Sequence, residues 1–430
     1  MPLIQLSEVS KYPEKEVSLK GWVFNVRSSG SIYFLQFRDG SGRIQAVISK
    51  KEVDSKTWQA CGKLTMESSI ELFGTVHEDK RSAYGFELEV KDLKIIQLAE
   101  EYPIAKKEHG PEFLMDNRHL WLRSARQAAI LKVRDEVIWQ LRKFFRERGF
   151  VLTDSPILTP TSCEGTTTLF STDYFDTKAY LAQTGQLYIE ATAAALGRVY
   201  DFGPTFRAEK SKTRRHLTEF WMLDAEAAFV DFEENLKIQE ELVSQVVQNI
   251  LIERREELKL LERDTKILEK VAVPFPRLTY DEAVTRLIKA GLKMKRGDDF
   301  GGDEETAISK QFDRPVFITH FPTKIKAFYM KPDPADPELS LGDDLLAPEG
   351  FGEIIGGSER IDDLKLLEKR LKEFKLPRQD FEWYLDLRRY GSFPHSGFGL
   401  GLERLVRWIC GLEHIRETIP FPRLINRLKP

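Results

Sequence analysis

The sequence predicts an α+β fold in two parts, and three observations support this. Residues 16–97 contain five short segments rich in β-branched and aromatic residues, separated by glycine and serine turns, which is typical of a small β-barrel. Apolar residues then recur at helical spacing in residues 127–147 and in roughly 233–262. Finally, residues 205–210 and 219–227 alternate in the manner of a strand hairpin. A barrel is therefore expected to precede a larger domain of helices and strands.

The composition is that of a globular chain. Its 430 residues are 41% hydrophobic and 31% charged, which is enough to bury the cores of two or three domains. The formal net charge of -3 gives no basic surface over the whole protein, so any contact with nucleic acid has to depend on local basic patches. The N-terminal residues lack the apolar core of a signal peptide, and no window approaches a membrane span. We expect no membrane partner.

The cysteines indicate a reducing compartment. Cys61, Cys163 and Cys410 lie far apart and form neither a CxxC pair nor a Cys/His ligand spacing. We therefore expect neither a disulfide framework nor a structural zinc site, and the sequence predicts a cytoplasmic protein.

The first domain is expected to cover residues 1–98. Five strands in under roughly 90 residues suggest a closed barrel, and the OB-fold is the nucleic-acid-binding form of that size. In its second strand Ile32, Phe34 and Gln36 share one face, and Tyr33, Leu35 and Phe37 share the other. The alternation alone leaves open which of the two faces is the barrel core.

A linker and a second, larger domain are expected to follow. Residues 99–118 are charged, contain two prolines in residues 99–114 and lack periodicity, so we interpret them as a linker or hinge. The second domain, residues 119–430, opens with the helix at 127–147, which Gly149 is expected to end. Residues 271–330 mix proline, glycine and short apolar runs, and are interpreted as an inserted subdomain.

The predicted hairpin carries charge on one face. It reads "FRAEKSKTRRHLTEFWMLDAEAAF" over residues 206–229, so Arg207 and Glu209 share a side. On its second strand the same count groups Phe220, Met222, Asp224 and Glu226. A solvated sheet face would explain this pattern. So would a binding surface, with a basic loop at the tip formed by Lys210, Lys212, Arg214 and Arg215.

Three separated stretches resemble a known family. "ERGFVLTDSP" (147–156), "FRAE" with "RHLTEF", and "GFGLGLER" (397–404) are similar, in this order, to motifs 1, 2 and 3 of the class II aminoacyl-tRNA synthetases. The stretches "QTGQLYIE", "GEIIGGSER", "WYLDLRRYGSFPHSGFGLGLER" and "IPFPR" further resemble the aspartate and asparagine enzymes, most closely the bacterial-type asparaginyl-tRNA synthetases of subclass IIb. The resemblance covers essentially the whole chain. It implies an OB-fold anticodon-binding domain and a catalytic domain built on an antiparallel sheet flanked by helices.

The resemblance also implies a reaction. L-asparagine and ATP would give asparaginyl-adenylate and diphosphate, and the asparaginyl group would then pass to the 3'-end of tRNA(Asn), leaving AMP. Such a site must hold two anions together, which suits the permanently charged fork of arginine. Arg207 and Arg404 are therefore the expected catalytic residues. The expected ATP-binding residues are Arg207, Glu209, Arg215, His216, Phe220, Glu353 and Arg404.

The amino-acid and metal sites are expected by the same resemblance. Glu164 and Gln186 would hold the α-ammonium, while Arg360 would donate to the side-chain amide and Asp224 would accept from it. The aspartate enzymes carry a lysine where this chain has Ile189, although Ile189 as ordinary core filling explains that position equally well. Mg²⁺ would bind Asp344 and Glu353, with Asp343 as the rival of Asp344.

Contacts with tRNA and with a second subunit follow from the resemblance too. Phe34 would stack on an anticodon base and Gln45 would hydrogen-bond it, with Phe34 as plain barrel core as the alternative. The basic hairpin loop would meet the tRNA acceptor end, and Pro156 with the preceding helix would form a homodimer interface.

Three other functions remain open on the sequence. An aspartyl-tRNA synthetase of relaxed specificity is favoured by Asp224 and opposed by Ile189. A synthetase-like ammonia ligase that makes free asparagine would need neither the barrel nor the basic loop. A regulatory relative without catalysis would not need Arg207, Glu353 and Arg404 together.

Overall fold

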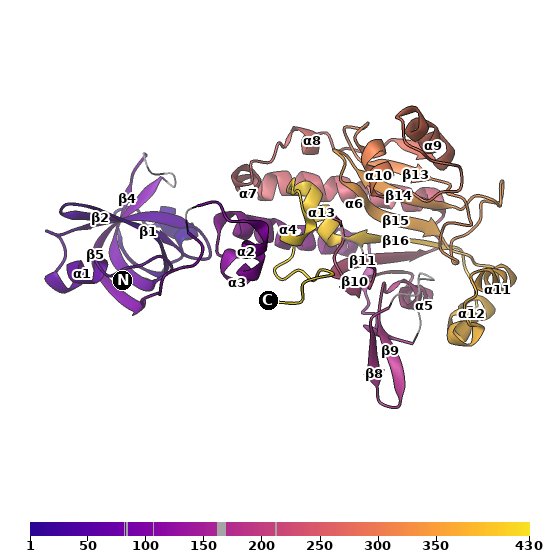
Figure 1. Ribbon diagram of the computed structural model, residues 1–430, viewed down its shortest axis with the longest axis horizontal. Coiled ribbons are helices and arrows are strands. Elements are labelled where there is room, and N and C mark those ends of the chain that lie inside the picture. Colours follow the sequence, from indigo (N-terminus) through magenta and orange to yellow (C-terminus); the bar gives the residue numbers. More distant parts are fainter. Residues whose placement is uncertain (81, 83–84, 106, 161–168, 211–212) are drawn as a thin grey trace. The chain divides into compact units, whose positions relative to one another are not determined.

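The computed structural model describes residues 1–80, 82, 85–105, 107–160, 169–210 and 213–430, and divides the chain into two compact units, Met1–Gly110 and Pro111–Pro430 (Figure 1). Each unit has a hydrophobic core of its own. In the described residues no helix combines the length and the apolar character needed to cross a membrane.

The first unit is a closed barrel, as the sequence predicts. Its five strands in the described residues follow the order β1-β2-β3-β5-β4. They are β1 (Glu16–Ser29), β2 (Ile32–Arg38), β3 (Arg43–Ser49), β4 (Ser69–Glu78) and β5 (Phe86–Gln97), with η1 (Leu6–Lys11) before them and α1 (Ser55–Cys61) between β3 and β4. Leu35 and Phe37 are fully buried in the barrel, so Phe34 lies on the outer face and is half-buried. The core interpretation of Phe34 is therefore wrong.

The predicted linker is partly helical. Residues 111–116 form α2 (Pro111–Asp116), and α3 (Arg118–Trp121) follows it within the second unit. Proline is well suited to the first position of a helix, because its missing N–H would have no partner there. The sequence did not predict this helix, because six residues are too few to show a periodicity.

The second unit is organised around one large sheet. Its eight strands in the described chain follow the order β12-β13-β14-β15-β16-β11-β10-β6, and all neighbours are antiparallel except β12 with β13 and β10 with β6. These strands are β6 (Val151–Leu152), β10 (Arg198–Phe206), β11 (Glu219–Ala228), β12 (Arg277–Thr279), β13 (Val316–Thr319), β14 (Gly342–Ala347), β15 (Gly352–Glu359) and β16 (His395–Gly401). A small sheet of order β7-β9-β8 comprises β7 (Leu158–Thr159), β8 (Ser171–Tyr174) and β9 (Thr177–Leu181).

Helices cover one face of the large sheet. In Figure 1, α4 (Ala125–Glu147), α6 (Phe232–Glu253) and α13 (Leu402–Ile409) lie along the sheet, and their apolar residues share a single core with its strands. The other helical segments are α5 (Gln186–Leu196), α7 (Arg255–Leu260), α8 (Lys266–Glu269), α9 (Tyr280–Lys289), α10 (Gly302–Ser309), α11 (Leu364–Glu373), α12 (Glu382–Arg389), η2 (Arg378–Phe381) and η3 (Ile415–Glu417). The opposite face is covered only in part, by α5 at β10 and β11 and by α9 and α10 at β13 and β14, and we call it the open face because polar side chains line the space between these helices.

Both long helices predicted from the sequence are present, and the second one ends earlier than predicted. Helix α4 starts after the cap Ser124, whose hydroxyl accepts from the Gln127 backbone N–H, and it ends just before Gly149. The single helix predicted over 233–262 is interrupted at Arg254, which has a non-helical backbone (φ −126°, ψ 29°) and pairs with Glu136 of α4 at 2.6 Å. The apolar periodicity does not reveal a break of a single residue, so the sequence predicted one continuous helix.

The predicted hairpin is present in the structure. Strands β10 and β11 pair antiparallel with Thr205 opposite Phe220 and Asp201 opposite Asp224. Strand β10 ends at Phe206, so Arg207 lies just beyond the strand rather than within it. Side chains at 220, 222, 224 and 226 point to the open face of the sheet, as the alternation predicts.

The 271–330 segment continues the large sheet at one edge. Strands β12 and β13 join it beside β14, while α9 and α10 pack against them in a separate apolar cluster centred on Tyr280 and Phe321. The segment therefore shares the sheet with the rest of the second unit.

Candidate active site

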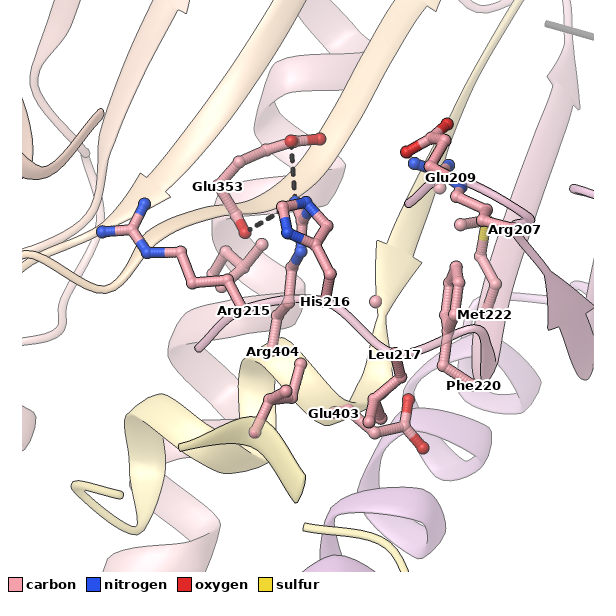
Figure 2. Close-up of a pocket in the computed structure, with 14 residues that line it drawn as sticks. Arg207, Glu209, Arg215, His216, Leu217, Phe220, Met222, Glu353, Glu403 and Arg404 are labelled. Carbon is pink, nitrogen blue, oxygen red and sulfur yellow. Dashed lines mark hydrogen bonds and ion pairs between the residues drawn. The ribbon is translucent and has the colours of Figure 1, made fainter. Parts of the chain in front are cut away.

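A pocket of about 640 Å³ lies on the open face of the large sheet, between the hairpin β10–β11, β15 and the start of α13. We call it the large pocket. It brings together every residue that the sequence predicted for ATP: Arg207, Glu209, Arg215, His216, Phe220, Glu353 and Arg404. Figure 2 shows these side chains converging from segments nearly 200 residues apart. The sequence did not predict its other labelled lining residues, Leu217, Met222 and Glu403.

One end of the large pocket is strongly charged. Arg404 donates from Nη1 to Glu353 Oε2 at 2.7 Å and to the Glu353 carbonyl at 3.2 Å (Figure 2). Burial alone would raise the pKa of Glu353, but Arg404 and Lys326 lower it to about 2. The carboxylate is therefore ionised at neutral pH. A fixed guanidinium next to a fixed carboxylate suits the binding of a metal-bound polyphosphate.

The other end of the large pocket is flat and aromatic. The Arg207 guanidinium lies over the Phe220 ring, 5.5 Å from its centroid, and Met222 and Gly399 complete the wall. Phe220 is half-buried against Leu217, so one ring face remains available to the pocket. An aromatic ring of this kind is a platform on which a planar base can stack.

Arg215 and His216 take different directions at the rim. Arg215 donates to Glu305 and Thr306 of α10 and to the Gly350 carbonyl, and Figure 2 shows its guanidinium pointing away from the Glu353–Arg404 pair. His216 lies beside Arg404 in that view. Burial, followed by the nearby charge of Arg404, lowers the pKa of His216. Of these two expected ATP-binding residues, His216 is therefore the one whose side chain lies beside the Glu353–Arg404 pair.

The expected metal ligands lie on one sheet face. A Cβ placed on Gly356 would be 3.2 Å from Glu353 Oε1 and 3.7 Å from Asp344 Oδ1, so the two carboxylates are close. Asp343 lies on the other face, where Gln239 of α6 donates to it at 3.2 Å. This arrangement favours Asp344 over Asp343 as a ligand.

Lys326 is the present partner of Asp344. Its Nζ donates to the two carboxylate oxygens at 2.9 and 2.7 Å. Burial raises the pKa of Asp344 to about 7, against the attraction of Lys326. In the described residues no group of three or more His, Cys, Asp or Glu side chains is arranged for a metal. Two carboxylates are nevertheless enough for Mg²⁺ when phosphate oxygens and waters supply the other ligands.

A second, smaller pocket of about 310 Å³ adjoins the first, since Met222 lines both of them. Asp224 is in its wall, and its Oδ2 accepts from the Thr184 hydroxyl at 2.7 Å and from the Gly185 N–H at 2.9 Å. Asp201, directly opposite Asp224 on β10, also lines the pocket, and burial raises the pKa of Asp201. The small pocket is therefore acidic.

Arg360 is held by a buried carboxylate next to Asp224. Its Nε and Nη2 donate to Glu226 and its Nη1 donates to Ser358 Oγ at 2.6 Å. The two charged side chains are 3% and 0% exposed. A guanidinium has five N–H donors, so the contacts among described residues leave one N–H on each terminal nitrogen. These two N–H groups can donate to one more oxygen atom.

Gln186 belongs to a buried polar network. It donates from Nε2 to Glu190 at 3.2 Å, and Glu190 also accepts from Arg388, Tyr384 and His395. Ile189 is 1% exposed and packs with Ala193, Val199 and Phe393, which agrees with the core interpretation of that position. Glu164 and Lys212 lie outside the described residues.

The comparison with known families assigns this architecture. The family described as tRNA synthetases class II (D, K and N) matches residues 110–425. This chain belongs to that family. A second family, the OB-fold nucleic acid binding domain, matches residues 17–96 of the synthetase and so coincides with the barrel.

Relatives of the synthetase are similar over the full length. An asparagine–tRNA ligase of Pelotomaculum thermopropionicum is 59% identical over 100% of both chains, and one of Desulforamulus reducens is 59% identical over 99% of both. Among solved structures, the asparaginyl-tRNA synthetase of Pyrococcus horikoshii complexed with asparaginyl-adenylate has a TM-score of 0.97 and 46% identity, with 99% of each chain covered.

The barrel of the synthetase presents Phe34 and Gln45 on one outer face. Gln45 lies opposite Gln36, and Phe34 lies opposite Val47, on the neighbouring strands β2 and β3. The Gln45 amide donates to Glu87 at 2.6 Å. The two side chains thus lie two residue pairs apart on a half-buried face.

Sequence reasoning assigned no role to four residues of the site. Asp201, Glu226, Lys326 and Glu305 all contact predicted site residues, yet none lies in a motif that required them. Strand alternation did group Glu226 with Asp224, and the facing position of Asp201 follows from the hairpin register. The contacts of Lys326 and Glu305 come from a segment without a recognisable pattern.

Proposed function

We propose that this synthetase is an asparagine–tRNA ligase, and the environment of Arg360 carries the proposal. The guanidinium is neutralised by Glu226 at 3.1 Å, so the subsite offers a donor fork without a net positive charge. Asp224 adds a carboxylate nearby. A side-chain amide finds a donor and an acceptor there, whereas the carboxylate of aspartate would meet excess negative charge.

In the first half-reaction the asparagine carboxylate attacks the α-phosphorus of ATP. A new bond forms between a carboxylate oxygen and that phosphorus, while the bond from the α-phosphorus to the oxygen bridging to the β-phosphorus breaks and diphosphate leaves. Arg207 would stabilise the charge that develops at the α-phosphate, and Arg404 would hold the outer phosphates. Phe220 would carry the adenine, with Glu209 at its edge and His216 near the phosphates.

Asp344 and Glu353 would hold Mg²⁺ with ATP. The ion would neutralise phosphate charge when bound. Support comes from the closeness of the two carboxylates and from the ionised state of Glu353.

In the second half-reaction a hydroxyl of the terminal ribose of tRNA(Asn) attacks the asparaginyl carbonyl, and AMP leaves. Phe34 would stack on an anticodon base and Gln45 would bond its edge, since OB-folds hold single strands with aromatic platforms and polar side chains. The basic loop with Lys210 and Arg214 would meet the acceptor end.

We also propose a cytoplasmic homodimer with Pro156 at the interface. Exposed apolar side chains follow this proline along the chain, Ile157 at 45% and Leu158 at 41%, and Trp139 of the preceding helix α4 is 62% exposed. Such a patch is typical of a protein interface. A monomer by light scattering at micromolar concentration would overturn this part.

The test is ATP–diphosphate exchange with asparagine and with aspartate in parallel, followed by charging of tRNA(Asn). Exchange with asparagine and formation of asparaginyl-tRNA are expected. Exchange with aspartate alone would indicate an aspartyl-tRNA synthetase, or an ammonia ligase if ammonia then yields free asparagine. No exchange with either amino acid would indicate a relative without catalysis.

A further inference from the structure

The helix α10 of the 271–330 segment contacts the large pocket through one carboxylate. Glu305 Oε2 accepts from Arg215 Nη1 at 3.1 Å and from the backbone N–H of Glu353 at 2.9 Å. Arg215 precedes His216 in the hairpin loop, and Glu353 is paired with Arg404. One oxygen atom therefore joins two separate walls of the pocket.

The neighbouring contacts strengthen this junction. Arg215 Nη2 donates to the Thr306 hydroxyl and, at 2.6 Å, to the Gly350 carbonyl. The Arg215 and Glu305 side chains are only 15% and 17% exposed. A charge-assisted pair that is shielded from water and bonded on both ends is stronger than a surface pair.

The backbone is shaped to admit this pair. Gly352 has φ +81°, and a Cβ on it would collide with Glu305 Oε2 and lie 2.5 Å from Arg215 Nη1. Only glycine lets the two side chains pack directly on the backbone that leads into Glu353. Three parts of the chain thus fit one another at this point.

The charges around Glu305 also connect it to the pocket. Burial, followed by the charge of Glu353, raises the pKa of Glu305, while Arg404 and Arg215 oppose this. Glu305 is therefore electrostatically coupled to the residues expected to face the phosphates.

We propose that Glu305 is a positioning residue for ATP, through which α10 holds the Arg215–His216 rim and the Glu353 wall in the geometry that ATP needs. The inference rests on the proposed function of the large pocket as an ATP site. It gives the 271–330 segment a part in that site. Arg215 then acts on ATP through its neighbours, with Glu305 as its anchor.

The test measures ATP affinity and asparagine affinity separately in the full-length protein. Glu305→Gln keeps the size and an acceptor for the Glu353 N–H but removes the charge that holds Arg215. We expect the Kd for Mg-ATP, by calorimetry without amino acid, to rise about tenfold. The KM for asparagine in exchange should change by less than about twofold.

A double-mutant cycle makes the role specific. Arg215→Gln should raise the Kd for Mg-ATP to a similar extent. The double variant should bind Mg-ATP no more weakly than either single variant, because both substitutions remove the same junction. Glu413→Gln is the matched control, since it removes the partner of the adjacent loop arginine, Arg214, in a pair that is 67% and 75% exposed. It should leave ATP affinity unchanged.

The outcomes are distinct. An unchanged Kd for ATP in Glu305→Gln, additive effects in the cycle, or an equal effect of Glu413→Gln would each overturn the proposal. A parallel loss of ATP and asparagine affinity together with a lower melting temperature would assign Glu305 a purely structural role and overturn it as well. Failure of the proposed function would instead show as absent asparagine-dependent exchange in the wild-type protein.

Discussion

Replacing Arg360 with lysine separates charge from geometry in the amino-acid subsite. The substitution keeps a cation for Glu226 but replaces a planar fork with a single ammonium. Three N–H groups of Arg360 donate to Glu226 and Ser358. Its contacts with described residues leave two N–H groups for a substrate. Lysine has three donors in all, and holding Glu226 leaves it unable to reproduce the two-pronged grip.

The expected magnitude follows from the lost hydrogen bonds. Two charge-assisted bonds to the asparagine side chain are each worth about 1.5–3 kcal/mol. Their loss lowers kcat/KM for asparagine by roughly 10²–10⁴-fold. Stability should fall by only about 1–3 kcal/mol, because the buried charge of Glu226 keeps a partner and mainly the Ser358 bond and some packing are lost.

The assay is diphosphate exchange at varied asparagine and at varied ATP, with urea unfolding beside it. The KM for ATP should be unchanged, since Arg360 does not line the large pocket. Arg370→Lys is the control: this arginine is 6% exposed and donates to Glu373 at 3.0 Å and to the Thr323 carbonyl at 2.7 Å, outside the two pockets. A kcat/KM for asparagine within about threefold of wild type in Arg360→Lys would refute the reasoning.

Three further substitutions test other parts of the molecule. Arg207→Ala should lower exchange by about 10³-fold without changing the melting temperature, because it removes a donor aimed at developing charge, and near-normal exchange would contradict the phosphate assignment. Phe34→Ala should raise the KM for tRNA in charging by about tenfold, given 1–3 kcal/mol per stacked base, with exchange unaffected; an unchanged KM for tRNA would show that this face does not read the anticodon. Burial and then the charge of Arg416 lower the pKa of His414 from 6.5 to about 4, and its Nδ1 accepts from the Arg416 N–H at 3.1 Å. The unfolded chain therefore binds the extra proton between these pH values, so stability should fall as the pH drops from about 6.5 to 4, by about 1 kcal/mol after solvent screening. His414→Gln should make the melting temperature less dependent on pH in this range. The same pH dependence of the melting temperature in the variant and the wild type would contradict the prediction.

Local geometry made much of the site predictable. The period of a strand is fixed, so the residues at 220, 222 and 224 had to share a face once the hairpin was recognised. The barrel strands and helix α4 were visible for the same reason. The half-buried surface of Phe34 was not, because alternation shows two faces without saying which one is inside.

Contacts between distant segments were beyond sequence reasoning. Arg360 and Glu226 are 134 positions apart, and Arg215 and Glu305 are 90 apart, so no spacing connects them. The choice between Asp343 and Asp344 had a different obstacle. Strands β14 and β15 shift register between Leu345 and Leu346, and a one-residue shift exchanges the faces of every side chain.

The glycines of β16 have a consequence for how this site can change during evolution. A Cβ on Gly397 would collide with Glu226, and one on Gly399 would lie 2.8 Å from Asp224 Oδ1. The two carboxylates therefore rest directly on the peptide backbone of the neighbouring strand. On this wall the length of the β11 side chain determines how far the carboxylate reaches, so adding one methylene at position 224 would reshape the cavity while the sheet beneath it stays the same.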